Sequence, residues 1–371
     1  MNDVYDIYSW FWDSNYGVNF QRVEKINIEE LWFRSHLLML SNKKDKARER
    51  YRNWFKQNKW RIRLKNKKQL ADTILENTNS SIPKYSIYLQ IHFTLKKPYF
   101  SKDDDEFYII DNPIVKDKVF KLPVVKATTW KGALRFAAIK VFEDWIYEKP
   151  NKSKIDKETV FKERARIVKL FGNEKDSQKD YLGRLCLLAI GGDLPTGEKL
   201  RKEIEKINKE FEKWLTDKKY VSKDVPLRSG RLFFYPTFFE EISLDVITPL
   251  SRETKTPVRG PIYFETAPEN AKGIFRLLYY PFDLIARGEL DRIESEIEED
   301  LNFLSKALQK MFYEIGFSAK KSSGFGVISE LEGKILISFK DIDTEFKSFE
   351  ELNFSKLCTK VNKTVNYGAS K

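Results

Sequence analysis

The sequence predicts an α+β fold, with a four-stranded antiparallel sheet and two helices against one face. Short segments rich in β-formers alternate between apolar and polar residues, which is typical of half-buried strands. Two long segments carry apolar residues at helical spacing instead. Once a helical insertion and a polar excursion are set aside, these elements follow the order β–α–β–β–α–β, which predicts this arrangement.

Residues 1–82 read as a helical, basic N-terminal extension. Ile28–Leu40 carries apolar residues at helical spacing, and a polar break at Asn77–Ser81 ends in Pro83. Residues 83–371 are therefore expected to form the main domain.

The first strand and helix of that domain follow in order. Tyr85–Leu95 alternates and is rich in β-formers, and Phe107–Ile110 adds a short strand-like segment. Thr129–Tyr147 predicts an amphipathic helix, and Thr128 or Thr129 is placed to cap it.

Residues from about 148 to 225 are rich in lysine and glutamate and predict a helical insertion with a break at Gly191–Gly192. Strand character returns at Arg231–Phe239. A polar excursion, Pro249–Gly273, then lies between β-like segments at Ile242–Ile247 and Ile274–Tyr280. An excursion between two strands predicts a protruding hairpin or loop, here a thumb at about 243–274.

A second amphipathic helix is expected over Glu289–Ile315, with Gly316 as its C-cap. Gly326–Leu331 then predicts the fourth strand of the sheet, and Lys334–Phe339 could add another. The whole order is that of a ferredoxin-like, or RRM-like, fold, which hosts many unrelated functions.

The net charge indicates a polyanionic partner. The chain has 67 Lys and Arg against 55 Asp and Glu, a formal charge of +12. Thirteen of the basic residues and only two acids lie between Lys43 and Lys68, a local charge of +11. A charge-rich thermophilic surface is an alternative source of many lysines, but it does not concentrate the excess in one stretch.

Aromatic residues lie among those cations, at Tyr51, Trp54, Phe55 and Trp60. The mixture suits stacking on bases while pairing with phosphates. The alternative is that the aromatics form the buried face of a helix, since their spacing of three and four also fits packing. The candidate RNA contacts in this stretch are Lys56, Lys59 and Arg63.

The sequence gives no sign of export. Cys186 and Cys358 are the only cysteines, too few for a disulfide framework, and no segment approaches the roughly 20 apolar residues of a membrane span. The N-terminus lacks a signal-peptide pattern. We therefore expect a cytoplasmic protein without a membrane partner.

Two motifs are candidates for phosphate binding. Thr128 and Thr129 open a helix that also carries Lys131 and Arg135 one turn apart, although an ordinary cap with solvated cations has the same pattern. The second motif, Gly316–Gly326, places Lys320, Lys321, Ser322 and Ser323 among glycines, which also suit a simple helix-to-strand turn.

Two loop residues complete the candidate sites. Asp111 lies in a loop and can hold a divalent cation or accept a proton from a ribose hydroxyl, although such residues are usually turn formers. Arg252 lies in the proline-stiffened excursion, which can reach across nucleic acid or form a mobile surface loop.

Together these motifs resemble the RAMP superfamily of CRISPR proteins, and specifically the backbone subunits of type III effector complexes. Asp111 precedes the Thr128–Arg135 run at the family's spacing, although Ala127 stands where the family has glycine. Ser251–Thr254 and Tyr263–Pro268 match the family's thumb. The likeness covers roughly 85–331.

The resemblance implies a ribonucleoprotein subunit that binds CRISPR guide RNA, target RNA and other effector subunits. Asp111 would be the catalytic and metal-binding residue of an endoribonuclease that uses a divalent cation such as Mg²⁺. The lysines, arginines and hydroxyls of the two glycine-containing motifs would contact guide RNA, and Arg252 would act in the thumb. The alternatives are a non-catalytic scaffold or end-capping subunit, and a guide-processing endonuclease.

Overall fold

The computed structural model describes residues 12–13, 17–18, 44–59, 61–77, 82–103, 110–148, 155–173, 178–191, 194–249, 251, 253–257, 260–340, 342–353 and 356–357. The helical pattern expected at Ile28–Leu40 lies outside these residues, as do Arg252, Trp60 and most of Phe107–Ile110. The chain divides into two compact units. Unit 1 comprises 1–73, 98–124 and 238–271, and unit 2 comprises 74–97, 125–237 and 272–371.

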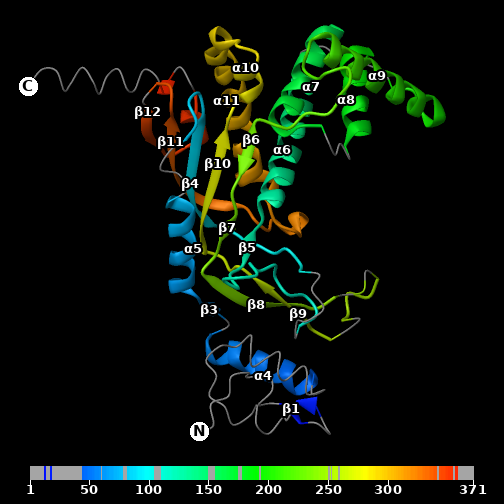
Figure 1. Ribbon diagram of the computed structural model, residues 1–371. Helices are drawn as coiled ribbons and strands as arrows, with labels where there is room; N and C mark the ends of the chain where they lie inside the picture. The colour runs from blue at the N-terminus through cyan, green and yellow to red at the C-terminus, as the bar shows by residue number, and fades with distance from the viewer. Residues whose placement is uncertain are drawn as a thin grey trace, which may run out of the picture. The chain divides into compact units, whose positions relative to one another are not determined.

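Unit 2 is built on an antiparallel sheet of five strands, one more than the sequence predicts. The strand order is β12–β11–β4–β10–β6 (Figure 1). Their bounds are Ile87–Leu95 (β4), Leu232–Phe234 (β6), Lys272–Tyr279 (β10), Ile328–Ile337 (β11) and Ile342–Phe346 (β12). β4 occupies the centre of the sheet, and all of its apolar side chains are buried.

Two helical segments cover one face of this sheet, as expected. They are α6, Ala127–Tyr147, and α11, Ile293–Gln309, which continues through a π-helical turn at Lys310–Ile315 and ends at Gly316. Trp130 of α6 is fully buried and lies 6.1 Å from Phe93 and 4.9 Å from Phe275, ring centroid to centroid. These aromatic contacts join α6 to β4 and β10, and so fix where α6 begins.

The capping prediction for α6 is wrong. The helix begins at Ala127 with Lys126 at the N-cap, and among the described residues no side chain caps it. Thr128 and Thr129 therefore lie inside the first turn. The helix begins two residues earlier than expected, and Trp130 in its first turn is buried, with its Nε1 donating to Thr237 Oγ1 across 3.1 Å.

The described residues of the insertion form three helices, α7 (Lys157–Phe171), α8 (Lys179–Gly191) and α9 (Gly197–Asp217). The first of these is capped by Asp156, whose side chain accepts a hydrogen bond from Thr159 N across 2.9 Å. The sequence predicts a break in the helical insertion at Gly191–Gly192, and α8 ends at Gly191.

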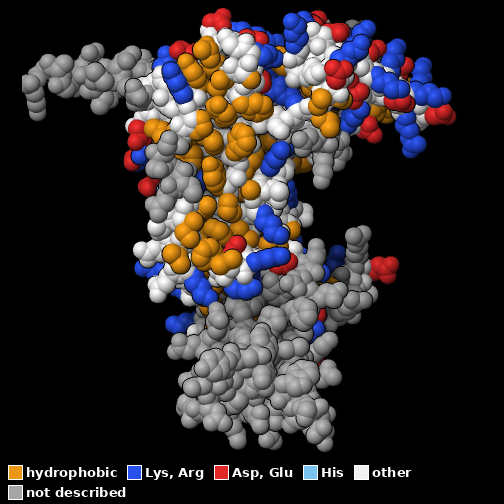
Figure 2. Space-filling view, in the orientation of Figure 1, with side chains coloured by type: hydrophobic (Ala, Val, Ile, Leu, Met, Phe, Trp, Pro, Cys, Tyr) orange, Lys and Arg blue, Asp and Glu red, His pale blue; other side chains and the backbone are white. Residues whose placement is uncertain are grey.

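In the view of Figure 2, hydrophobic side chains gather over β4, β10 and β6 of unit 2. Tyr88 of β4 contacts Tyr235 edge to face, with ring centroids 6.4 Å apart, and Phe233 of β6 is 44% exposed. The remaining elements of this unit are the short helices α10 (Phe282–Ala286), η2 (Leu290–Arg292), η4 (Lys321–Ser323) and η5 (Phe349–Glu351).

Unit 1 contains a three-stranded sheet in the order β3–β8–β9. The strands are Arg61–Arg63 (β3), Glu241–Ile247 (β8) and Ile262–Thr266 (β9). The pairing of β8 with β9 forms a β-hairpin, with Ser243 opposite Thr266, and β9 lies inside the polar excursion, where the sequence predicted no strand.

The basic helix α4, Lys44–Gln57, belongs to the same unit, and β1 (Trp12–Asp13) pairs with β2 (Gly17–Val18). Three elements lie at the boundaries between units: α5 (Lys65–Asn77), β5 (Val124–Val125) and β7 (Thr237–Phe238). In the described part of the chain, no helix is both long and apolar enough to cross a membrane.

Candidate nucleic-acid interface

A pocket of about 480 Å³ lies in unit 2 beside the first turns of α6. Three of the residues predicted to bind RNA line it: Thr128, Lys131 and Arg135. The other lining residues are Gly132, Phe171, Gly172, Gln178, Arg228, Ser229, Gly230, Leu232 and Phe233.

The wall formed by α6 is cationic. Lys131 is exposed and Arg135, one turn later on the same side of the helix, is half-buried. The first N–H groups of a helix have no partner within the helix and attract anions. The start of α6 therefore places backbone donors near two cations, and phosphate binding by these groups stays a prediction.

Another part of the lining is a backbone junction between the end of α7 and the segment before β6. Gly172 has a φ of +79° and forms a β-bridge with Ser229. A Cβ on Gly230 would lie 2.3 Å from Leu170 O, so only glycine fits there. This contact explains why the sequence has glycine at both positions.

A buried ionic network supports that junction. Arg231 is 1% exposed and binds Asp283 through Nε at 2.7 Å and Nη2 at 2.8 Å, and its Nη1 binds Asp300 at 2.8 Å. Arg228, which lines the pocket, lies 3.3 Å from Asp283 and donates to Tyr220 O at 3.2 Å. The network therefore fixes the position of Arg228.

The network also shifts acid pKa values. Burial alone would raise the pKa of Asp283, but hydrogen bonds from Arg231 hold it well below its ordinary range. Burial opposes ionisation of Glu296 as well, yet Lys169, 2.7 Å away, and Arg231 lower its pKa to about 2. These carboxylates are therefore charged in the folded protein at neutral pH.

The second glycine motif lies against the same helix. Lys321, in the 3₁₀ turn Lys321–Ser323, places its Nζ 5.0 Å from the centroid of the Phe136 ring of α6. Partial burial lowers the pKa of Lys321. Lys320 adopts a left-handed backbone with a φ of +61°, and Ser322 is exposed. Ser323 is exposed too, and Lys321 is the residue of this loop whose side chain contacts α6, at Phe136.

Asp111, the predicted catalytic and metal-binding residue, lies in unit 1 and is exposed. Its Oδ1 accepts a hydrogen bond from Arg48 Nη2 of α4 across 2.7 Å. Among the described residues, no group of three or more His, Cys, Asp or Glu side chains is placed to hold a metal ion. Asp111 therefore offers a single carboxylate, already paired with a cation.

Buried contacts hold α4 in place. The Tyr51 hydroxyl donates to Glu265 of β9, which also pairs with Lys116 and accepts from Ile114 N across 3.1 Å. Desolvation lowers the pKa of Lys116, and Glu265 opposes that shift. Phe55 is fully buried as well. For Tyr51 and Phe55, the packing interpretation is therefore correct.

The other candidate contacts of the basic stretch differ in their surroundings. Lys56 and Lys59 are exposed at the end of α4 and just beyond it. Arg63 of β3 is also exposed, but its Nε lies 2.8 Å from Glu241. Lys56 and Lys59 are the better candidates for a polyanion, since Arg63 would have to exchange an existing partner.

Several site residues were missed by sequence reasoning. Arg48 is 63 positions from Asp111, and Gln178 and Arg228 lie in or beside the insertion. No spacing rule links residues so far apart. The sequence feature that could have indicated this part of the pocket is the pair of glycines, Gly172 and Gly230, because each lies next to a segment that lines it.

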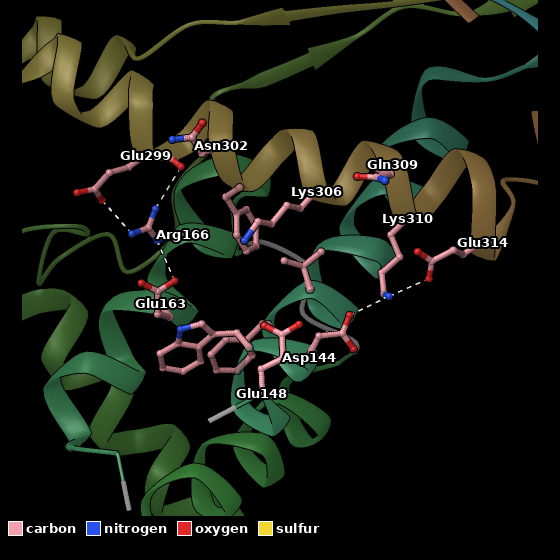
Figure 3. Close-up of a pocket in the computed structure, with 14 residues that line it drawn as sticks. Asp144, Glu148, Glu163, Arg166, Glu299, Asn302, Lys306, Gln309, Lys310 and Glu314 are labelled. Carbon is pink, nitrogen blue, oxygen red and sulfur yellow. Dashed lines mark hydrogen bonds and ion pairs between the residues drawn. The ribbon is translucent and has the colours of Figure 1, made fainter. Parts of the chain in front are cut away.

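A second cavity, of about 540 Å³, lies between α6, α7 and α11 (Figure 3). Its charged side chains are largely paired with one another. Arg166 lies 3.0 Å from both Glu163 and Glu299, and Lys310 lies 2.8 Å from Asp144. None of the residues predicted to bind RNA lines it. This cavity therefore reads as a polar junction that attaches the insertion to the core.

Comparison with known proteins places the chain in a family. The model of the RAMP superfamily matches residues 31–329. A curated relative, "CRISPR system Cms endoribonuclease Csm3" from Streptococcus thermophilus, is 32% identical over 76 residues, which is 20% of this chain and 30% of that protein.

A solved structure, "Cryo-EM structure of the Type III-B Cmr-beta bound to cognate target RNA", is similar with a TM-score of 0.38 and 14% identity, over 88% of this chain and 87% of that one. That likeness is too distant to carry an argument. The match to the family model, by contrast, covers most of the chain and includes every described residue of the pocket and of the Asp111 loop. The chain belongs to the RAMP superfamily.

Proposed function

We propose that this chain is an RNA-binding subunit of a type III CRISPR ribonucleoprotein, in which it holds guide RNA beside target RNA and other effector subunits. The observation that carries the proposal is the pocket at the start of α6, where Thr128, Lys131 and Arg135 meet. Family membership and the name of the similar protein support the same assignment. The five-stranded unit would be an elaborated ferredoxin-like core, and the protein would act in the cytoplasm.

The chemistry of the pocket suits the RNA backbone. Phosphate contacts supply most of the affinity of non-specific nucleic-acid binding and position the protein without reading sequence. Lys131 and Arg135 provide charge, and the helix start provides N–H donors. A guide-holding subunit needs such contacts, because it must accept guides of any sequence.

Binding of single-stranded RNA by the full chain tests this proposal. The Lys131→Glu/Arg135→Glu variant should bind RNA at least about tenfold more weakly in low salt, because two phosphate contacts become repulsive. Lys202→Glu/Lys206→Glu is the matched control, since it reverses two exposed lysines one turn apart on α9, outside the pocket. Equal affinities for all three proteins would refute the proposal.

Cleavage of target RNA at Asp111 is the finer part of the proposal. Mg²⁺ sites often use one or two protein carboxylates and take their remaining ligands from substrate phosphates and water, so a single Asp111 fits such a site only with RNA present. A bound cation would supply charge to the scissile phosphate. The Asp111 carboxylate would then be placed to accept the proton of a ribose 2′-hydroxyl.

A non-catalytic scaffold or end-capping role is the second candidate, and the Arg48–Asp111 ion pair favours it. A guanidinium beside the carboxylate competes with a metal cation for the same oxygen. Comparing wild type with Asp111→Ala in the assembled complex with Mg²⁺ separates the two roles. Loss of specific cuts with guide binding retained indicates catalysis, and unchanged cutting indicates a scaffold.

Guide processing is the third possibility, and it is less favoured. His36 and His92 are the only histidines in the chain, and His92 lies 2.9 Å from Gln90 on β4. Incubation of the chain with repeat RNA alone tests it. Site-specific cutting without partners would support processing.

A further inference from the structure

A cavity of about 480 Å³ lies in the helical insertion, and it shares no lining residue with the pocket beside α6. Its lining comes from α7, α8 and α9, which lie together in Figure 1, and from the segment that follows α9. Much of this lining is apolar, from Val168, Phe211, Leu215, Val221, Pro226 and Leu227. A largely apolar cavity of this volume with a few polar groups is typical of sites for small organic ligands.

Arg164 of α7 lines this cavity, and its buried charge has no acidic partner. The residue is 2% exposed. Its Nη1 donates a weak hydrogen bond to Cys186 Sγ across 3.9 Å, and its Nε has no hydrogen-bond partner. No carboxylate among the described residues forms an ion pair with it. An arginine stays protonated in proteins, so the charge cannot be removed by titration.

The neighbours of Arg164 do not supply a counter-charge. Burial raises the pKa of the Cys186 thiol, although Arg164 opposes that shift, so the thiol is neutral at pH 7. The Phe211 ring of α9 has its centroid 4.1 Å from Arg164 Cζ. The face of an aromatic ring attracts a cation, but this offsets only part of the cost of taking a charge out of water.

Arg231 shows how this chain neutralises a buried guanidinium elsewhere. It is as deeply buried as Arg164, and its nitrogens lie 2.7 Å from Asp283, 2.8 Å from Asp300 and 3.0 Å from Glu296. Buried charges in proteins are normally paired in this way. Arg164 instead lies beside a cavity, so an anion in that cavity would supply the missing partner.

We propose that this cavity is a binding site for a carboxylate with an apolar body, and that Arg164 pairs with the carboxylate. Guanidinium and carboxylate form strong, charge-assisted hydrogen bonds. Lys213 of α9, an exposed cation at the cavity, adds a second positive charge. The inference goes beyond RNA binding at the start of α6 and does not depend on it.

The lining favours a carboxylate over an RNA backbone. A phosphate chain brings a charge at every nucleotide, and most of the cavity surface is apolar. Glu212, which also lines the cavity and pairs with Lys179, would repel such a chain. A single carboxylate on an apolar body matches one buried cation among apolar side chains. The carboxylate can belong to a small organic acid or to an acidic side chain of a partner protein.

Thermal unfolding of the full chain with hexanoate tests the proposal. At constant ionic strength and pH 7, about 10 mM hexanoate should raise the melting temperature of wild type by about 1–3 °C, because a ligand that binds the folded state stabilises it. Hexanamide, the uncharged analogue, should leave it unchanged. Equal shifts with hexanoate and hexanamide, or no shift with either, would overturn the proposal. This comparison needs no variant, so it does not depend on how a substitution affects folding.

Arg164→Met assigns the effect to the buried guanidinium. Without ligand, its melting temperature should be unchanged or higher, because an uncompensated buried charge is replaced by an apolar side chain. Its shift with hexanoate should disappear. Arg184→Met is the matched control, since Arg184 is an exposed arginine of α8 outside the cavity, and this variant should respond as wild type does. A full hexanoate shift in Arg164→Met would refute the role of Arg164.

Two further probes identify the source of the carboxylate. The capped tripeptide acetyl-Leu-Glu-Leu-amide should stabilise wild type more than its glutamine analogue does if the ligand is a protein side chain. A shift with hexanoate and none with the tripeptide supports a small organic acid instead. Inorganic phosphate that stabilises wild type as much as hexanoate does would show a simple anion site and overturn the requirement for an apolar body.

RNA binding distinguishes this inference from the proposed function. Arg164→Met should bind single-stranded RNA as wild type does, and Lys131→Glu/Arg135→Glu should keep its response to hexanoate. Weaker RNA binding by Arg164→Met, with no effect of hexanoate on wild type, would assign the cavity to nucleic acid and overturn the proposal.

Discussion

Arg48 donates a hydrogen bond to Asp111 across 2.7 Å, and this contact joins the basic helix α4 to the loop that carries the candidate catalytic carboxylate. The side chains of Arg48 and Asp111 are 42% and 73% exposed, so RNA can reach both. Exposed ion pairs are typically worth about 0–1 kcal/mol. The contact therefore weakens access of a cation to Asp111 without closing the site.

The first prediction concerns this pair. If Asp111 supports cleavage, Arg48→Ala should increase target-RNA cleavage by the assembled complex at limiting Mg²⁺ by up to about fivefold. The reason is that the substitution removes an ion pair worth at most ~1 kcal/mol, which competes with Mg²⁺ for the Asp111 carboxylate. Arg50→Ala, on the same helix, is the control. Cleavage that falls in Arg48→Ala, with assembly intact, would show that the guanidinium assists the reaction and does not mask the carboxylate.

The buried ion pair between Lys116 and Glu265 gives the second prediction. Both side chains are 1% exposed. Glu265→Gln should lower the free energy of unfolding by about 3–5 kcal/mol, since it leaves the Lys116 charge buried without a counter-charge. Urea denaturation measures the change, with the exposed Glu253→Gln as control. A loss similar to that of the control would contradict this view of the cluster.

The third prediction is a dependence of stability on pH. The pKa of Glu296 is lowered to about 2 in the folded protein, against 4.5 ordinarily. A lowered folded-state pKa stabilises the protein above the unfolded pKa, and that contribution disappears as pH falls from about 4.5 toward 2. The free energy of unfolding should therefore decline over this window.

Glu296→Gln isolates that contribution. The variant should be less stable than wild type at pH 7, by about 1–3 kcal/mol, and its stability should fall less steeply between pH 4.5 and 2. Chemical denaturation at several pH values measures both slopes. Parallel pH profiles for the two proteins would show that Glu296 does not contribute.

The basic stretch supplies the fourth prediction. Charge reversal of Lys56 and Lys59 should weaken RNA binding and reduce the salt slope by about 0.7 for each lost contact with single-stranded RNA. Arg63→Glu should have a smaller effect on binding because Arg63 is already paired with Glu241. RNA titrations at several salt concentrations measure the slopes. An unchanged slope in the double variant would leave these lysines as a solvated surface.

The sequence could predict the elements whose periodicity is strong. Tyr85–Leu95 and Thr129–Tyr147 correspond to β4 and α6 because alternation and helical spacing reflect burial on one face. The fifth strand, β12, was missed. Its residues alternate, but two of the five are acidic and only its end positions are buried, so the apolar signal is weak.

The contacts that form the candidate sites were harder to predict from the sequence. The helix start of α6 and the turn at Lys321–Ser323 carry local signals, since glycines, hydroxyls and cations lie close in sequence. The Arg48–Asp111 pair and the Gly172–Ser229 bridge join distant segments, and their side chains are common surface types. Only the folded chain brings such residues together.

The central claim is that RNA lies along the first half of α6, and photocrosslinking tests it most directly. The assembled complex would be loaded with guide RNA that contains 4-thiouridine, irradiated, and analysed by mass spectrometry of crosslinked peptides. We predict crosslinks within Ala127–Arg135 and at Lys320–Ser323. Crosslinks confined to α9 or to the cavity between α6, α7 and α11, with none at the start of α6, would contradict the account.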